Sequence, residues 1–324
     1  MRREQIILQK KLLKEKFIGA LVGTFVGDAL GMAVEGYSLE RIKADYGQID
    51  HMLEARLGSG TYTDDTEMMI GVAESLASVG GFDGEDMANR FIDNFNLDRG
   101  YGGGTIQALN NIKAGTSWQE AGKHIFGNGS FGNGSAMRVA PIGLYYYDKY
   151  EELKAKAKKS SLITHAHPLG KLGAALQALV VGYVINQDPR QNLSQGDCLK
   201  FLANTLEIED TEFSHKLKIT KELLANKPKP EEVARKLGND TRVFSSVPTA
   251  IYSFLANVNS FSEAVMYAIT LGGDTDTLGA MTGAIAGAYH GLNAIPQKWL
   301  KSLENKEKGL DYVIELGEKL FELK

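Results

Sequence analysis

Two short acidic clusters are the residues of this sequence best suited to chemistry. One is Thr63-Asp64-Asp65, and the other is Asp274-Thr275-Asp276-Thr277, which follows paired glycines. Hard divalent cations bind carboxylate and hydroxyl oxygens, and Mg2+ requires near-octahedral geometry at about 2.0–2.1 Å. Clustered carboxylates without cations repel one another, which raises their pKa values. Four aspartates and two threonines can hold two ions, so the clusters together predict a binuclear metal site.

Each cluster also has a simpler explanation as the start of a helix. Asp64 followed three residues later by Glu67 fits a capping box, and a helix cap would account for one of the two aspartates Asp274 and Asp276. A cap does not account for both members of a pair. No feature of the sequence pairs these aspartates with arginines, so metal ions are the natural counter-charge.

Glu35 and Asp28 are two further acidic positions, in one apolar segment. Glu35 lies at the end of that segment, just before Gly36. A carboxylate there faces the unfavourable end of the helix dipole, so either a functional role or a solvated side chain explains it. Asp28 lies inside the segment, and we interpret it as a hydrogen-bond partner for a neighbouring loop.

The segment 127–138 is a loop dense in Gly, Asn and Ser that can turn backbone N–H groups toward an anion. It lacks the lysine of a P-loop and does not join a strand to a helix, which excludes the two common nucleotide fingerprints. Phe131 within it could stack on a base or pack on a ribose, although a structural turn is the better explanation of such a loop when it is taken alone. His165 is a candidate ligand contact, and its spacing from His167 could be mistaken for a zinc site.

Helices must position these residues, because apolar side chains recur at helical spacing through the chain. Three such faces begin at Met69, Leu169 and Ala264, and glycines recur at spacing four from Gly19 to Gly31. That glycine stripe predicts a helix packed closely on a neighbour. There is no alternating strand pattern, and residues 186–240 are expected to form peripheral helices. No linker divides the chain, so we predict an all-α fold, a single compact orthogonal helical domain over residues 1–324.

The composition of the chain limits which classes of partner and which cellular compartment we expect. The chain has 324 residues, 43% of them hydrophobic, with a net charge of -4 and one cysteine, Cys198. It lacks the basic footprint of a nucleic-acid-binding protein, and a disulfide framework is impossible. The basic segment 1–16 before the apolar segment 17–34 faintly resembles a signal peptide. Asp28 interrupts the apolar run, however, so we expect a cytoplasmic protein without a membrane partner.

Several segments, taken in order, resemble the ADP-ribosylglycohydrolase family. The matching pieces run from Phe17 to Trp299 and are GDALGMAVE, YTDDTEM, RGYGGGT, NGSFGNGSAMRVAPIGL, THAHPLG, SVPTAIYSFL and LGGDTDTLGAMTGAIAGAYHG. The family resemblance implies an all-helical protein with two Mg2+ or Mn2+ ions in a cleft. The loop is most similar to the form that cleaves ADP-ribose from serine, in which a tyrosine usually stands at the place of Phe131.

The resemblance also implies roles for individual residues. The implied metal ligands are Thr63, Asp64, Asp65, Asp274, Asp276 and Thr277. Glu35 is the implied acid or base, and Asp65 and Asp274 are its implied catalytic partners. Contacts to ADP-ribose are expected from Gly129, Ser130, Phe131, Gly132 and His165.

The expected reaction is metal-dependent hydrolysis of the bond between ADP-ribose and its acceptor. The partner would be a protein modified on serine or arginine, or a small conjugate such as O-acetyl-ADP-ribose. Two alternatives remain open at this point. One is hydrolysis of another ribosyl or nucleotide compound, and the other is a non-catalytic relative that binds ADP-ribose. The intact acidic clusters disfavour the second alternative.

Overall fold

The protein is described by a computed structural model covering residues 2–206 and 211–324, in which the regular elements are helices. The two isolated β-bridges join loops, Ser38 to Gly272 and Gly132 to Arg242. The prediction of an all-α fold is therefore confirmed for the described residues. The three helical faces expected from sequence lie in α3 (Asp64–Val79), α9 (Pro168–Val184) and α14 (Phe261–Thr270).

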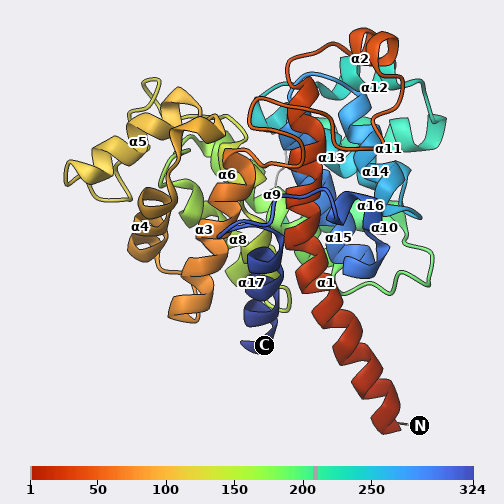
Figure 1. The fold of residues 1–324 in the computed structure, drawn as a ribbon, viewed down its shortest axis with the longest axis horizontal. Coiled ribbons are helices and arrows are strands. Elements are labelled where there is room, and N and C mark those ends of the chain that lie inside the picture. Colours follow the sequence, from red (N-terminus) through yellow and green to blue (C-terminus); the bar gives the residue numbers. More distant parts are fainter. Residues whose placement is uncertain (1, 207–210) are drawn as a thin grey trace.

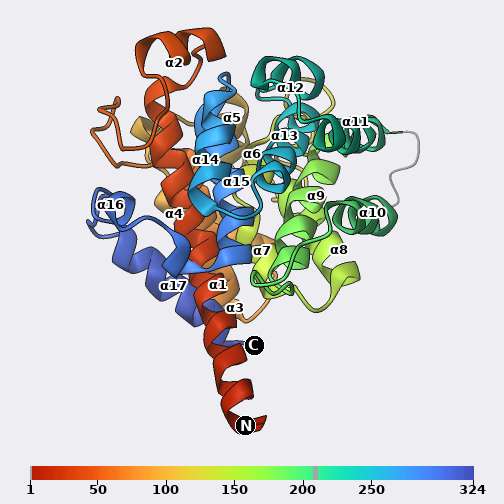
Figure 2. The same ribbon diagram turned by 90° about the vertical axis from the view of Figure 1, so that its right-hand side faces the viewer.

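Two buried helices from opposite ends of the chain form the centre of the molecule. They are α1 (Arg2–Gly31) and α15 (Thr275–His290), which lie side by side in Figures 1 and 2. A Cβ atom on Gly27 would lie 2.0 Å from the Gly279 carbonyl oxygen, and one on Gly23 would lie 2.2 Å from that of Gly283. The glycine stripe predicted from sequence is thus the contact that lets the two backbones touch.

The remaining helices surround this pair. The N-terminal half contributes η1 (Met32–Val34), α2 (Leu39–Asp45), α4 (Gly84–Asn94), η2 (Leu97–Arg99), α5 (Gly103–Lys113), α6 (Gly134–Met137), α7 (Ala140–Tyr145) and α8 (Tyr150–Ser161). The C-terminal half contributes α10 (Gln195–Leu206), α11 (Glu212–Asn226), α12 (Pro230–Leu237), α13 (Val243–Ala256), η3 (Leu292–Ala294), α16 (Gln297–Leu300) and α17 (Leu310–Glu322). As Figure 2 shows, α10, α11 and α12 lie on the outer side, as expected for the segment 186–240.

Local sequence signals explain where several helices begin and end. Thr63 caps α3 by accepting a hydrogen bond from the Asp65 N–H, and Gly80 ends the helix in the left-handed conformation with φ +74°. Asp83 caps α4 in the same way, and Pro168 occupies the first turn of α9. These signals fix the start of α3, the helix that carries the first acidic cluster.

By length and composition alone, Leu8–Val34 is apolar enough to cross a membrane. Ninety-four per cent of its most apolar window is buried inside the protein, as in the core helix of a globular protein.

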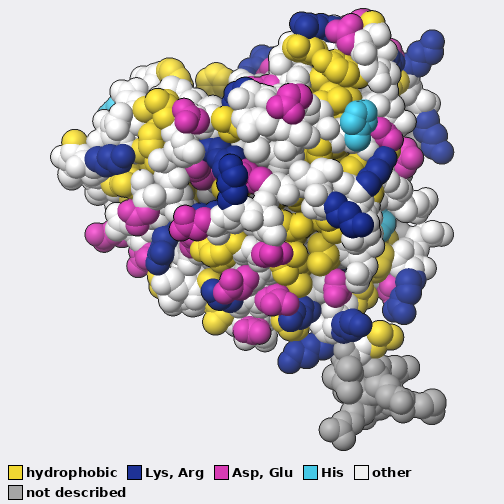
Figure 3. Space-filling view, viewed as in Figure 1, with side chains coloured by type: hydrophobic (Ala, Val, Ile, Leu, Met, Phe, Trp, Pro, Cys, Tyr) yellow, Lys and Arg dark blue, Asp and Glu magenta, His cyan; other side chains and the backbone are white. Residues whose placement is uncertain are grey.

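Lys, Arg, Asp and Glu side chains are interspersed over the face of the molecule drawn in Figure 3.

Candidate active site

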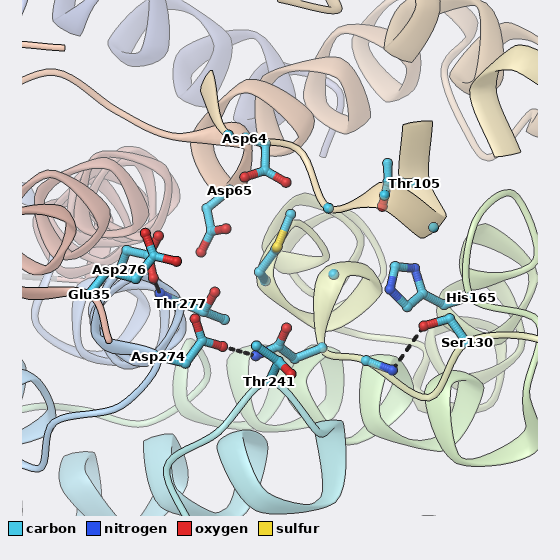
Figure 4. A pocket seen from close by; sticks show the side chains of 18 of the residues that line it. Glu35, Asp64, Asp65, Thr105, Ser130, His165, Thr241, Asp274, Asp276 and Thr277 are labelled. Atoms are coloured by element: carbon cyan, nitrogen blue, oxygen red, sulfur yellow. Dashed lines mark hydrogen bonds between the residues drawn. The ribbon is translucent and has the colours of Figure 1, made fainter. Parts of the chain in front are cut away.

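A cleft of about 280 Å³ gathers carboxylates from three separate parts of the chain. They belong to Glu35, Asp64, Asp65, Asp274 and Asp276. Figure 4 shows them together at one end of the cleft, with Ser130 and His165 toward the other end. Thr277, Thr105, Asn133 and Thr241 also line it. The structure thus brings together most of the residues predicted to bind metal.

Asp28 holds the first acidic cluster in place through hydrogen bonds to Thr63 and Thr66. Its carboxylate is fully buried and accepts hydrogen bonds from the Thr63 N–H at 3.0 Å, the Thr66 N–H at 3.1 Å and the Thr66 hydroxyl at 2.6 Å. Burial raises the pKa of Asp28 to about 6, and these hydrogen bonds oppose that rise. The interpretation of Asp28 as a partner for a neighbouring loop agrees with these contacts.

The capping-box interpretation of Asp64 and Glu67 is wrong. Thr63 is the N-cap of α3, and Asp64 is the first helical residue. The Glu67 carboxylate instead accepts a hydrogen bond from the Asn96 N–H at 3.1 Å and lies 3.4 Å from the Tyr101 hydroxyl. The smaller threonine takes the cap, which leaves both aspartates free to face the cleft. Thr63 itself is buried and is not among the residues that line the cleft.

Backbone pairing between two loops brings Glu35 to the second acidic cluster. The Gly36 N–H donates to the Gly273 carbonyl oxygen, and the Gly273 N–H donates to that of Tyr37, both at 2.8 Å. Gly272 and Gly273 have φ values of +73° and +78°, a conformation that favours glycine. Carboxylate oxygens of Glu35, Asp274 and Asp276 consequently lie within 4.8 Å of one another.

The loop 238–242, between α12 and α13, supports the same cluster. The Asn239 carbonyl oxygen accepts a hydrogen bond from the Asp274 N–H at 2.8 Å. A Cβ atom on Gly273 would lie 2.1 Å from this oxygen, so a larger residue would not fit. From the opposite side the Asn133 amide donates to the Asp274 carboxylate at 2.5 Å. The segment expected to be only peripheral therefore reaches the site at its end.

The carboxylates repel one another in a buried environment. Burial, followed by the charge of Asp28, raises the pKa of Asp64 to about 8. Burial and neighbouring carboxylates raise the pKa values of Asp65 and Asp276 well above the usual range. Such shifts are typical of carboxylates that are crowded together in a buried environment. Among the described residues, the ion pair that reaches this cluster joins Arg56 to Glu35 at 3.1 Å.

The donor set fits a hard divalent cation. The Asp65 Oδ2 atom is buried and has no hydrogen-bond partner, which is costly unless a ligand completes the site. Glu35, Asp274 and Asp276 together offer three carboxylate groups within reach of one ion. Every candidate ligand atom is an oxygen, which suits Mg2+ or Mn2+ better than a soft metal. Glu35, which was predicted only as an acid or base, thus also lies within ligand distance.

The glycine-rich loop 127–133 separates this cleft from a second one of about 400 Å³. Ser130 and Gly132 line both clefts, whereas Gly129 and Phe131 line the second. The Phe131 ring is partly exposed and stacks on Phe244 at a centroid distance of 6.1 Å. The predicted ADP-ribose contacts therefore line these two neighbouring clefts.

His165 and His167 do different things, and neither geometry indicates zinc. Burial and the nearby Arg138 lower the pKa of His165 to about 3, so its imidazole is neutral. The ring packs so closely that a Cβ atom on Gly134 would lie 2.6 Å from it. His167 instead accepts a hydrogen bond from the Leu169 N–H and caps α9.

Several residues that line the site were not singled out from the sequence, among them Arg56, Asn133 and Thr241. Asn133 belongs to the glycine-rich motif, so the motif was a usable signal. Arg56 and Thr241 lie in loops without periodicity, and no local pattern marks them. The Arg99–Gly104 loop, unspecific by sequence, forms the N-terminus of α5, and its glycines line the cleft.

Comparisons with known proteins agree on one family. The family model described as ADP-ribosylglycohydrolase matches residues 9–324. The chain is 36% identical to ADP-ribosylhydrolase ARH3 from Mus musculus, over 90% of this chain and 88% of the relative. It is 28% identical to ADP-ribosylarginine hydrolase Tri1 from Serratia proteamaculans, over 95% of this chain and 79% of that protein. A solved structure described as an ADP-ribosylglycohydrolase-related protein complex superposes with a TM-score of 0.70 at 26% identity, covering 97% of this chain and 99% of the other.

Proposed function

This chain belongs to the ADP-ribosylglycohydrolase family, and from that membership we propose that it hydrolyses the bond between ADP-ribose and a modified acceptor. We take serine-linked ADP-ribose as the first candidate substrate, because the relatives at 36% identity are named ADP-ribosylhydrolase ARH3. Arginine-linked and O-acetylated ADP-ribose are the other candidates. We place the activity in the cytoplasm.

The observation that carries the proposal is the cluster of five carboxylates in one cleft. Asp65 contributes a buried carboxylate oxygen without a partner, and the pKa values of its neighbours are raised. A structural role would not require this arrangement, since unpaired buried charge is unfavourable. We therefore infer that the role of this cluster is to bind a ligand.

Asp64, Asp65, Asp274, Asp276 and Thr277 would hold two divalent cations. Ions so placed would supply positive charge to bind ribose hydroxyls and to orient the attacking water, as paired metals do about 3.5–4 Å apart in other hydrolases. Thr63 would contribute by capping the helix that carries Asp64 and Asp65.

Hydrolysis adds the oxygen of water to C1 of the ribose, and the bond from C1 to the acceptor breaks. The electron pair of that bond leaves with the acceptor atom, which takes up a proton. The transition state resembles an oxocarbenium ion, so nearby carboxylates stabilise it. Glu35 lines this cleft with a side chain that is 43% exposed, and it would exchange this proton. Asp274, whose carboxylate accepts a hydrogen bond from the Asn133 amide, would orient the attacking water.

The rest of ADP-ribose would extend from the first cleft into the second. The loop 129–132 would hold the diphosphate with backbone N–H groups, and the N-terminus of α5 would add a favourable dipole. Phe131 and Phe126, whose rings are exposed, offer a stacking surface for the adenine. Neutral His165 can contact a ribose hydroxyl without placing a charge there.

The test is a substrate panel with the purified full-length chain. Serine-linked, arginine-linked and O-acetylated ADP-ribose are each incubated with Mg2+, with Mn2+ and with EDTA, and released ADP-ribose is measured. We expect turnover with metal on at least one conjugate and none with EDTA. Absence of turnover on all three, with ADP-ribose binding intact in calorimetry, would support the non-catalytic alternative. Full turnover in EDTA would contradict the metal site.

A further inference from the structure

Arg56 lies in the loop between α2 and α3 and makes two hydrogen bonds in different directions. One guanidinium nitrogen donates to the Glu35 carboxylate at 3.1 Å, and another donates to the Arg99 carbonyl oxygen at 2.7 Å. Both paired side chains are partly exposed, Arg56 at 39% and Glu35 at 43%. Among the described residues, Arg56 is the one lysine or arginine that lines the carboxylate cleft.

The backbone beside Arg56 is shaped around its guanidinium. Gly100 has φ +94°, and a Cβ atom there would lie 2.0 Å from an Arg56 nitrogen. Any side chain at this position would therefore displace Arg56. The glycine thus serves two purposes, because it allows the left-handed backbone and leaves room for the arginine.

Arg99, which accepts from Arg56, is itself held firmly. Its guanidinium donates to the Glu304 carboxylate at 2.6 Å and to the Tyr62 carbonyl oxygen at 2.8 Å, and it lies 3.6 Å from the centre of the Tyr62 ring. The Arg99 and Glu304 side chains are 13% and 8% exposed, so solvent screens this pair little. Arg56 is consequently anchored on a fixed backbone, which an exposed surface ion pair lacks.

Glu35 needs such an anchor because its side chain is 43% exposed where it lines the cleft. Its carboxylate lies within 4.8 Å of those of Asp274 and Asp276, and its exposed side chain is otherwise free to turn away into solvent. The opposite charge of Arg56 at 3.1 Å attracts the carboxylate and favours this one orientation.

We propose that Arg56 is a positioning residue that holds the Glu35 carboxylate against the acidic cluster, where it faces the bond to be broken. This inference rests on the proposed function of Glu35. Arg56 acts through Glu35 and does not itself contact the reacting atoms. Its loss should therefore slow the reaction without weakening the binding of ADP-ribose.

The test compares R56Q, R56K, E35Q and the double variant E35Q/R56Q with the wild-type chain. The matched control is R41Q, because Arg41 is also an exposed arginine paired with a carboxylate, Asp45 at 3.3 Å, but lies outside the cleft. We expect R56Q to lower kcat about 10- to 100-fold while KM changes less than about twofold. The kcat of R56K should lie between those of R56Q and the wild type, because one ammonium group cannot reproduce both directed hydrogen bonds. R41Q should match the wild type.

Two outcomes decide the inference. If Arg56 acts through Glu35, R56Q should cost nothing further on the E35Q background, and equal losses on both backgrounds would overturn the proposal. Crystal structures of the wild type and R56Q give a readout that does not depend on activity. We expect the Glu35 carboxylate to turn away from Asp274 and Asp276 in R56Q, and an unmoved Glu35 would also overturn the proposal. An inactive wild type would instead contradict the proposed function.

Discussion

At the scale of residues, the site combines buried and exposed carboxylates with different tasks. Asp65 and Asp276 are buried and crowded, whereas Glu35 lies exposed at the rim and is paired with Arg56. Crowded acids are suited to bind cations, because their charges are unfavourable without them. An exposed acid can exchange a proton with solvent and with a leaving group. This division suggests separate tests for the two kinds of carboxylate.

Replacing Glu35 by Gln should reduce turnover and leave ligand affinity nearly unchanged. General acid–base groups contribute about 10²–10⁴-fold in rate, while the remaining residues would still hold ADP-ribose. Rate is measured by ADP-ribose release, and affinity by calorimetry with ADP-ribose and Mg2+. The control is E40Q, because Glu40 is an exposed glutamate in α2. A Gln variant with wild-type turnover would show that Glu35 is only a solvated helix end.

Replacing Asp65 by Asn should abolish most activity without destabilising the metal-free protein. Burial and neighbouring carboxylates raise the pKa of Asp65, so its charge is unfavourable in the metal-free protein, and a neutral amide of similar shape should change the free energy of unfolding by less than about 1 kcal/mol. Loss of outer partners of metal ligands already costs about 10- to 100-fold, and a ligand should cost at least as much. Rates and urea unfolding are measured together. D83A, which removes the cap of α4, should lose about 1 kcal/mol and keep its activity, and the same result for D65N would assign Asp65 a structural role.

At the scale of elements, the contact between α1 and α15 determines where the two halves of the site lie. Asp28 lies within α1 and Glu35 follows shortly after its end, whereas Asp274 and Asp276 lie at the start of α15. Because the helices touch along glycines, their separation is smaller than side chains would allow. The position of the carboxylates therefore depends on residues with no chemistry of their own.

Replacing Gly27 by Ala should destabilise the protein strongly. The new methyl group would begin 2.0 Å from the Gly279 carbonyl oxygen, so the backbones must separate. Overpacking costs about 1–3 kcal/mol in general, and a contact between two backbones should lie at the upper end of that range. The free energy of unfolding in urea checks this, with G196A as the control, because Gly196 lies in α10 with open space around it. G196A should be neutral or stabilising by up to about 1 kcal/mol, and equal stability of G27A would contradict the tight contact.

Lys16 links α1 to the end of α9, and this contact should make the stability of the protein depend on pH. Its ammonium donates to the carbonyl oxygens of Ile185 and Gln187 at the end of α9, and burial lowers its pKa to about 8. The unfolded chain, with a pKa near 10.5, binds more protons above pH 8, so stability rises with pH in that window. The wild type should gain about 1–2 kcal/mol relative to K16M between pH 8 and pH 9.5. A difference that stays constant over this range in urea unfolding would contradict the lowered pKa.

At the scale of the whole molecule, distant parts of the chain close around one site. The Glu304 carboxylate, near the C-terminus, accepts hydrogen bonds from the Tyr62 N–H and the Arg99 guanidinium. Glu74 of α3 is similarly bound by Lys308 and by Tyr312 of α17. Binding at the carboxylates should therefore stabilise the complete fold.

Mg2+ should raise the melting temperature, and EDTA should reverse the rise. A ligand that binds only the folded state stabilises it by about 2.7 kcal/mol at 100 times its Kd. Calorimetric melts with Mg2+, Mn2+ and EDTA measure the effect, and D65N should show a smaller shift than the wild type. A melting temperature that is independent of all three additions would contradict the metal site.

The sequence alone predicted the helices, the close contact of α1 and the positions of both acidic clusters at helix starts. Those features leave local marks, because helical spacing, capping residues and glycine stripes each repeat or recur within a few residues. Only the tertiary structure decided that Thr63 caps α3 in place of Asp64, and that Asn239 and Arg56 reach the site. It also decided that Glu35 lies against Asp274, through backbone hydrogen bonds of Gly36 and Tyr37 with Gly273. Contacts between loops far apart in the chain depend on how the helices pack, and they leave no period in the sequence from which they could be predicted.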